Sequence, residues 1–208
     1  MDHTQVAPST SVIPVSLSSV TLRIVAAMVG SLLVAICAHV SVPLLFTPVP
    51  LTLQTFAVLL IGLTLGPATA FAALTLYLIQ GAAGFPVFSP HGPGGVLQLM
   101  GPTGGYLLSY PFAAAVTSLL ARRIRPVSFT SYAFSAAMGS LLIFAVGASW
   151  FALVSQQSMG ATLKMTVLPF LPGDALKICA AAAVAIGILK FRNKLNGPSA
   201  SLHRGAAH

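Results

Sequence analysis

The sequence predicts an all-α integral membrane protein, folded as a compact bundle of six transmembrane helices with both termini in the cytoplasm. Of its 208 residues, 56% are hydrophobic and 6% are charged, and the mean hydropathy is +0.93. A chain with so few charges cannot present an ordinary globular surface to water. Its apolar residues also form six stretches that Pro, Gly and Arg residues separate, which is the pattern of a multi-pass membrane protein.

The predicted helices cover residues 20–40, 51–65, 68–82, 104–122, 131–156 and 173–191. The second and third are short, at roughly 15 residues each, against the ~20 that a perpendicular span needs. Gly66-Pro67 between them leaves room only for a tight turn, so they form a helical hairpin for which incomplete crossing stays open. A secretory signal peptide is the alternative for the first stretch, but the lead before it is long and five further stretches follow.

The chain divides into a membrane domain over residues 20–191 and two tails. Residues 1–19 are rich in Ser, Thr and Pro and nearly free of charge, and residues 192–208 are polar and basic. We expect both tails to be mobile, because neither has enough apolar residues to bury.

The basic residues indicate the orientation of the six helices. With the N-terminus inside, Lys164 is the only basic residue of the connections and tails that is outside, and Lys177 lies within a span. The remaining basic residues are then cytoplasmic: Arg23, Arg122, Arg123, Arg125, Lys190, Arg192, Lys194 and Arg204. This eight-to-one bias agrees with the rule that cytoplasmic loops of membrane proteins carry the excess of Lys and Arg.

Three longer connections are predicted on the outer side, over residues 39–50, 83–103 and 157–172. They carry Pro, Gly and aromatic residues, whereas the inner connections are short. Loops of this length above a helical bundle are suited to cover an outward-facing pocket.

Asp174 is the residue at which a function is first sought. It is one of two carboxylate side chains in the chain, and the other, Asp2, lies in the polar N-terminal tail. Charged residues inside a membrane usually face a cavity and mark a functional site. Lys177 follows by about 300° of rotation and ~4.5 Å of rise, so both side chains leave the same helical face. Together they can bind a ligand that has N–H donors beside an oxygen acceptor, and a self-neutralising ion pair is the alternative.

A second candidate segment is the glycine-rich stretch at residues 101–106, where the fourth helix begins. Gly104 and Gly105 allow a backbone to approach a ligand closely, Thr103 can cap or donate, and Tyr106 offers a ring and a hydroxyl. Close packing between helices is an equally good explanation of these glycines. Gln54, in Pro-Leu-Thr-Leu-Gln at 50–54, is expected one turn into the second helix, with its amide available to a ligand or to backbone.

The first helix carries small residues at four-residue spacing, namely Ala27, Ser31 and Ala35. Such a row lets another helix approach closely, either within this chain or on a partner subunit.

Several functions are disfavoured by what the sequence lacks. No GxxxxGK[ST] phosphate loop and no acid for magnesium are present, so the chain cannot use ATP itself. The basic residues gather at helix ends, which argues against nucleic acid as a partner. Cys37 and Cys179 lie singly in apolar runs, and His39 and His91 have no second ligand at metal spacing, so no metal or other cofactor is predicted.

Four motifs in order resemble one family. They are residues 48–63 (PVPLTLQTFAVLLIGL), 81–88 (GAAGFPVF), 101–106 (GPTGGY) and 169–177 (PFLPGDALK), and the resemblance covers roughly residues 20–190. The family is BioY, the biotin-specific substrate-binding subunits of energy-coupling-factor (ECF) transporters. The resemblance implies a subunit of a bacterial plasma membrane that binds biotin near the outer face. It also implies docking on a transmembrane coupling subunit with two ATP-binding-cassette ATPases.

Biotin as ligand also suits the residues already singled out. Asp174 can accept from its ureido N–H groups, while Lys177 meets an oxygen from either end of the molecule. The bicyclic ring of biotin requires aromatic or apolar walls, and the candidates are Phe85, Phe88 and Tyr106, with Trp150 of the fifth helix a weaker one.

The resemblance also makes the row on the first helix a docking face for the coupling subunit. The residue pattern leaves open a self-sufficient biotin carrier working as an oligomer. A membrane enzyme with Asp174 as base is disfavoured, because one acid without a metal site is too little for catalysis.

Overall fold

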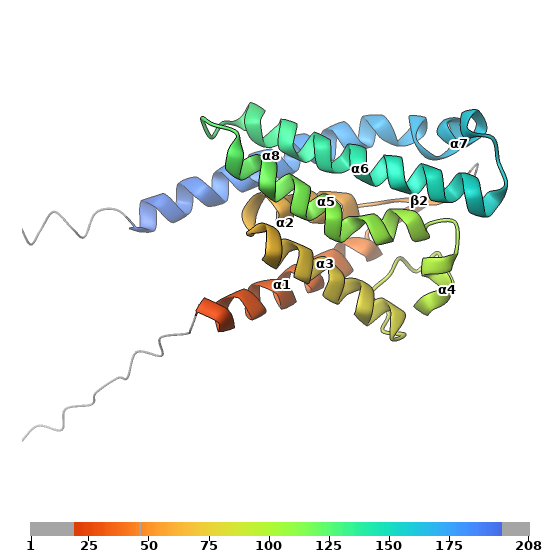
Figure 1. The fold of residues 1–208 in the computed structure, drawn as a ribbon, viewed down its shortest axis with the longest axis horizontal. Coiled ribbons are helices and arrows are strands. Elements are labelled where there is room, and N and C mark those ends of the chain that lie inside the picture. The colour runs from red at the N-terminus through yellow and green to blue at the C-terminus, as the bar shows by residue number, and fades with distance from the viewer. Residues whose placement is uncertain (1–18, 46, 197–208) are drawn as a thin grey trace, which may run out of the picture.

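The structure is a computed structural model, and it describes residues 19–45 and 47–196. The predicted tails therefore lie largely outside the described residues. Six helices of ten residues or more form the body of the described part (Figure 1). Their bounds are α1 Ser19–His39, α2 Gln54–Thr64, α3 Pro67–Ala82, α5 Gly104–Arg123, α6 Phe129–Ser155 and α8 Leu171–Asn196.

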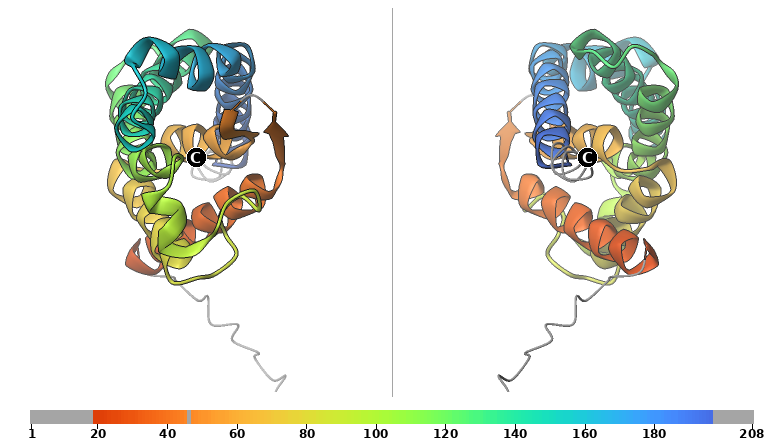
Figure 2. Two further views of the ribbon diagram at one scale, coloured as in Figure 1. Left: turned by 90° about the vertical axis from the view of Figure 1, so that its right-hand side faces the viewer. Right: turned by 90° about the vertical axis from the view of Figure 1, so that its left-hand side faces the viewer.

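The long helices lie alongside one another, with α1 at the edge of the group (Figure 2). α5 packs on α6, α3 packs between α1 and α5, and α8 packs on α2 and α6. Among the described helices, α1, α5 and α6 are both long and apolar enough to cross a membrane, and α2 and α3 are shorter apolar helices. α8 continues five residues past the predicted end of the last helix.

The outward faces of these helices carry large apolar side chains. On α1 alone, Leu22, Met28, Leu32 and Ile36 are each more than half exposed. A water-soluble surface would not carry such a continuous apolar face, whereas the hydrocarbon of a bilayer matches it. The chain is thus a membrane protein with several apolar helices, as its composition predicts.

All-α is a slight simplification, because one of the long connections forms a β-hairpin. β1 Ser41–Leu44 pairs antiparallel with β2 Thr47–Thr52, with Ser41 opposite Thr52. The predicted start of the second helix at residue 51 is therefore wrong, and α2 begins at Gln54. Pro48 and Pro50 explain the difference, because proline holds the preceding residue in an extended conformation and cannot donate a helical hydrogen bond.

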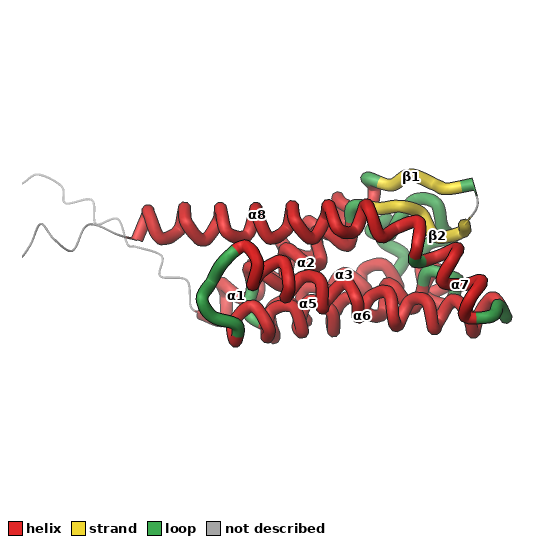
Figure 3. The backbone as a smooth tube through the Cα atoms, turned by 90° about the horizontal axis from the view of Figure 1, so that it is seen from above, coloured by secondary structure: helices red, strands yellow, loops and turns green. Residues whose placement is uncertain are grey.

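The other two long connections contain short helices. α4 Gly95–Met100 lies in the second connection, and α7 Met159–Thr166 and the 3-10 helix Leu168–Phe170 lie in the third. Figure 3 shows the hairpin and α7 at one end of the helical body, while the last part of α8 extends at the other end. The three long connections thus gather at the same end, as the sequence predicts.

Two other boundaries follow directly from local sequence. Gly66 caps α3 with Pro67 at its first position, so the hairpin of α2 and α3 turns where it was predicted. α6 starts two residues before its predicted position, because the Ser128 hydroxyl accepts from the Ser131 amide while the Ser131 hydroxyl accepts from the Ser128 amide. This reciprocal capping fixes the start of the helix.

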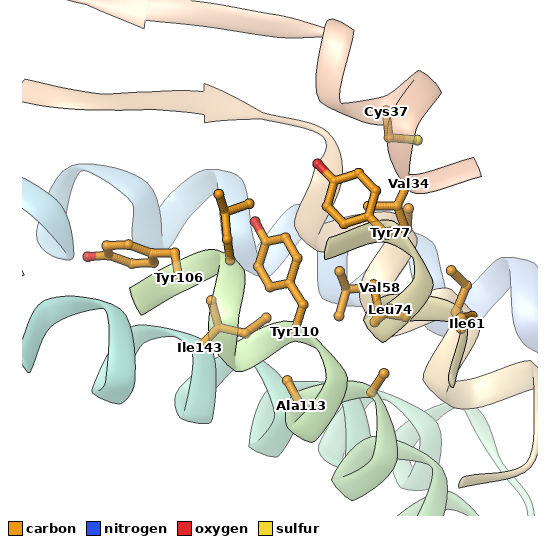
Figure 4. Packing of buried hydrophobic residues seen from close by; sticks show 14 of the residues in the cluster. Val34, Cys37, Val58, Ile61, Leu74, Tyr77, Tyr106, Tyr110, Ala113 and Ile143 are labelled. Carbon is orange, nitrogen blue, oxygen red and sulfur yellow. The ribbon is translucent and has the colours of Figure 1, made fainter. Parts of the chain in front are cut away.

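Small and aromatic side chains share the interior. Ala70, Ala73 and Ala113 are fully buried, which lets α1, α3 and α5 approach one another closely. Three tyrosines, Tyr77, Tyr106 and Tyr110, are buried in the same cluster, as Figure 4 shows. Buried tyrosine hydroxyls require hydrogen-bond partners, and these partners lead to the candidate site.

Candidate functional site

A cavity lies between the helices at the end where the three long connections gather. It encloses about 650 Å³, counting the part open to solvent. Helices α2, α5, α6 and α8 and all three connections contribute to its lining. The polar lining residues are Thr52, Gln54, Thr55, Ser89, Gln98, Thr103, Tyr106, Tyr110, Ser140, Thr166, Asp174 and Lys177.

Asp174 lies in the first turn of α8 and is 6% exposed. The Ser140 hydroxyl of α6 donates to Asp174 Oδ2 at 2.5 Å. A carboxylate near a helix N-terminus is favoured by the helix dipole, and this hydrogen bond further offsets its burial. The other carboxylate oxygen remains available to a ligand in the cavity.

Lys177 lies one turn further along α8 and is half-buried. Its Nζ donates to Thr55 Oγ1 of α2 at 3.1 Å. The two charged groups of α8 are thus oriented by hydroxyls from two different helices, and both line the cavity. A pair whose sole role was mutual neutralisation would not need these separate partners, so the arrangement favours the ligand-binding interpretation.

Gln54 is the first residue of α2, not a residue one turn inside it, and it is 4% exposed. Its Nε2 donates to Tyr77 Oη at 2.5 Å, and its Oε1 accepts from Thr52 Oγ1 at 3.2 Å and from Tyr110 Oη at 3.5 Å. The network joins β2, α2, α3 and α5 at one wall of the cavity. It fixes the amide and leaves little freedom for its side chain.

Some residues of the segment 101–106 line the cavity, and others pack against neighbouring backbone and side chains. Thr103 and Tyr106 line the cavity, and the Tyr106 hydroxyl donates to the Thr166 carbonyl at 3.2 Å. Gly104 packs against the Leu99 carbonyl, and Gly105 packs against Trp150 of α6. The two glycines therefore serve the close packing that was the alternative explanation, and neither is among the cavity-lining residues.

The aromatic walls differ from those that were predicted. Phe85 is 63% exposed, and Phe88 is buried against Tyr77 with ring centroids 5.4 Å apart. Neither lines the cavity in this structure. Phe144 and Phe170 line it instead. Trp150 donates from its indole N–H to the Gly101 carbonyl at 2.9 Å, so it supports the segment behind the cavity.

Several lining residues were missed by sequence reasoning. Ser140 and Thr55 orient the two charges, but a lone hydroxyl in an apolar span is common and gives no distinct signal. Ser89 and Gln98 come from the second long connection, whose contacts a sequence does not show. The Ser89 hydroxyl is buried at the cavity and has no hydrogen-bond partner among the described residues. A buried hydroxyl without a partner fits a polar ligand.

The row of small residues on α1 faces the interior of the same chain. Ala27, Ser31 and Ala35 are all buried, and the Ser31 hydroxyl donates to Gln80 Oε1 of α3 at 2.5 Å. A partner helix could reach this row only by displacing α3. The row therefore packs against a helix of the same chain, which is one of the two roles that its spacing allowed. The other role, docking on a partner subunit, stays a prediction.

The cavity therefore presents one carboxylate, one ammonium and a set of hydroxyl and amide groups between apolar and aromatic walls. Within residues 19–45 and 47–196, no three His, Cys, Asp or Glu side chains converge as a metal site would require. Such a set binds a small solute that has both hydrogen-bond donors and oxygen acceptors. Fold and site together define a helical membrane protein with a polar cavity, suited to a small solute, at one end.

Comparison with known proteins places this chain in a family. Residues 8–194 match the family model described as the BioY family, so the chain belongs to that family. It is 36% identical over 153 residues to a probable biotin transporter BioY of Pyrococcus horikoshii, which covers 74% of this chain and 87% of the relative. It is 34% identical over 188 residues to the biotin transporter BioY of Rhodobacter capsulatus, with 85% and 94% covered.

A solved structure shares the fold. The crystal structure of the S-component for biotin from an ECF-type ABC transporter matches with a TM-score of 0.76, covering 81% of this chain and 91% of that one. Sequence identity between the two is 22%, so this likeness concerns the fold.

Proposed function

We propose that this chain binds biotin with high affinity in the cavity at Asp174 and mediates biotin uptake as a membrane subunit. The chain is a biotin transporter component of the BioY family and not an enzyme, and biotin is its transported substrate with no cofactor implied. The observation that carries the site assignment is the placement of Asp174 and Lys177. Both line one cavity, and hydroxyls from two other helices orient them.

The chemistry of biotin matches this cavity group by group. Its ureido ring has two N–H donors, and the free oxygen of Asp174 is an acceptor for them. Lys177 is a donor for an oxygen of biotin. Ser89, Gln98 and Tyr106 supply further polar contacts, and Phe144 and Phe170 supply apolar surface for the ring system.

The proposal extends to the membrane context. The last turns of α5 and α8, which carry Arg122, Arg123 and Lys194, lie at the end of the bundle opposite the cavity (Figure 1). Lys164 alone among the connections lies in α7 at the cavity end. By the positive-inside rule, the cavity faces outward in the bacterial plasma membrane and both termini are cytoplasmic.

The energy for uptake comes from partners in this proposal. The chain has no phosphate loop, so docking on an ECF coupling subunit with two ATPases supplies the ATP drive. The solved protein that shares this fold is an S-component from an ECF-type ABC transporter, which supports this arrangement.

Isothermal titration of the detergent-purified chain tests the ligand. Biotin should bind, whereas thiamin and riboflavin should give no heat beyond dilution. Binding of another vitamin in place of biotin would overturn the assignment of the ligand.

Growth of a biotin-auxotrophic host tests the coupling separately. A host that lacks every ECF coupling subunit and ATPase should not be rescued by this chain at low external biotin. Rescue in that host, with biotin binding intact, would instead establish a self-sufficient carrier.

A further inference from the structure

A second cavity lies at the opposite end of the same four helices. It encloses about 720 Å³, counting the part open to solvent, between the last turns of α2 and α5, the first turn of α6 and the second half of α8. Three arginines line it from three separate segments: Arg122 from α5, Arg125 from the connection to α6, and Arg192 from α8. Asp174 and Arg192 are 18 residues apart on α8, which corresponds to about 27 Å of helix.

The three guanidinium groups have no charge partner in the described part of the chain. Asp174 is the one carboxylate side chain among residues 19–196, and it lies in the other cavity. None of the three arginines makes a hydrogen bond or an ion pair within the described residues. Three cations that share a concave site without a counter-charge create a strong positive potential, which attracts an anion.

The Tyr132 hydroxyl adds a neutral donor beside the three arginines. Tyr132, on the first turn of α6, is half-buried and contributes its hydroxyl, and Arg122 lies over the turn between α2 and α3, near Gly66. Planar guanidinium groups with nearby hydroxyls are suited to the several oxygens of a phosphate group.

Apolar residues form the rest of the lining and continue onto the outer surface. Leu63, Ala121 and Ala185 are buried lining residues, while Ile188 of α8 lines the cavity and is 48% exposed. A soluble anion such as phosphate would make no favourable contact with this apolar surface. A phospholipid needs both parts, one for its head group and one for its acyl chains.

We propose that this cavity binds an anionic phospholipid of the surrounding membrane, with its phosphate between Arg122, Arg125 and Arg192. Its acyl chains lie along the exposed apolar face of α8. Basic pockets between membrane helices bind lipid head groups by this chemistry, and the attraction to anionic lipid is additive over the cations. The inference does not depend on the ligand of the first cavity.

Native mass spectrometry of the purified full chain tests the proposal, with phosphatidylglycerol or zwitterionic phosphatidylcholine added to the detergent. The test variant is R122Q/R125Q/R192Q. The control is R123Q/K190Q/K194Q, which removes the same three charges from the same end at residues outside the cavity lining. We expect wild type to retain one phosphatidylglycerol molecule, and the test variant to lose at least about tenfold in retention.

We expect the control variant to change retention by less than about twofold, because its charges act at longer range. Equal losses in the two triple variants would overturn the proposal, since they would reflect net charge alone. Equal retention of phosphatidylcholine by wild type would overturn it as well.

Titration with inorganic phosphate separates a lipid from a soluble anion. Phosphate binding that competes with phosphatidylglycerol at millimolar concentration, and is lost in the test variant, would replace the lipid with a soluble occupant. If the triple variant unfolds, Arg125→Gln takes its place, because Arg125, exposed like the other two arginines, is the one that lies outside a helix. It should by itself reduce phosphatidylglycerol retention severalfold, and unchanged retention would contradict the site.

Discussion

At the scale of the residue, hydroxyl groups from two other helices orient the charged groups of Asp174 and Lys177. The three-residue spacing on α8 only places the two side chains on one face. Ser140 binds the carboxylate from α6, and Thr55 binds the ammonium from α2. Each charge is thus pre-oriented before a ligand arrives, so less rotamer entropy is lost on binding. This predicts that the charges and their hydroxyl partners affect affinity to different extents.

Asp174→Asn and Lys177→Ala should each weaken biotin binding. The first removes a charge-assisted acceptor, at a cost on the order of 1 to 3 kcal/mol, and the second should cost at least as much because it leaves Asp174 without a neighbouring cation. Isothermal titration measures both losses. Lys164→Ala is the matched control, since Lys164 is exposed on α7 at the same end and does not line the cavity. Wild-type affinity in both cavity variants would show that the pair is structural.

Ser140→Ala should weaken biotin binding by about 1 kcal/mol, less than loss of the charge itself. The carboxylate would keep its charge and lose its fixed orientation. Ser149→Ala on the same helix is the control, because its hydroxyl bonds the Ala145 carbonyl on an exposed face. If titration gives equal affinities for the two variants, Ser140 has no positioning role.

At the scale of the element, the long apolar helices could be predicted and the connections could not. The apolar runs and the Gly, Pro and Arg residues between them predicted both ends of α3, α5 and α6 to within two residues of the observed ends. This is possible because an apolar run and its capping residues lie next to each other in sequence. The β-hairpin, α4 and α7 were missed, since elements of four to eight residues depend on packing across the end of the bundle.

The residues predicted for the candidate site show the same difference between the helices, with their caps, and the connections. Asp174, Lys177, Gln54, Thr103 and Tyr106 were chosen from the sequence and all line the cavity. The phenylalanines of the second connection do not, because the side on which a loop places its side chains is decided by tertiary contacts. Phe88 packs on Tyr77, a contact that no local pattern indicates.

Gly105→Ala tests the packing of α5 on α6. A Cβ there would overlap Trp150, close to the α6 backbone, so the two helices must separate at a cost of about 1 to 3 kcal/mol. Thermal unfolding in detergent should show a lower Tm. Gly187→Ala on α8 is the matched control, because a Cβ at Gly187 meets nothing within 4 Å, and it should leave the Tm equal or higher. An unchanged Tm for Gly105→Ala would contradict the tight contact.

At the scale of the whole molecule, the two cavities share four helices but have tight packing between them. A Cβ at Gly62 would lie 2.8 Å from the Ala114 carbonyl oxygen, and one at Gly139 would overlap Thr117. Leu59, Ala136 and Ala181 are fully buried in the same layer. Interiors packed at this density leave no path for a solute the size of biotin.

Proteoliposomes that contain this chain alone should therefore bind external biotin without filling their interior. Radiolabelled biotin retained after filtration should saturate at about one molecule per outward-facing chain, because Asp174 and Lys177 line a single cavity. Asp174→Asn proteoliposomes give the background. Continued accumulation beyond that stoichiometry would contradict a closed layer.

The closed layer between the cavities also determines how uptake responds to supply. A pore passes more molecules as the external concentration rises, whereas a chain closed in this way handles one molecule per cycle. Its maximal uptake equals the number of chains in the membrane multiplied by their cycling frequency. A cell that needs more vitamin must then make more copies of this subunit or cycle each copy faster, since abundance outside cannot compensate.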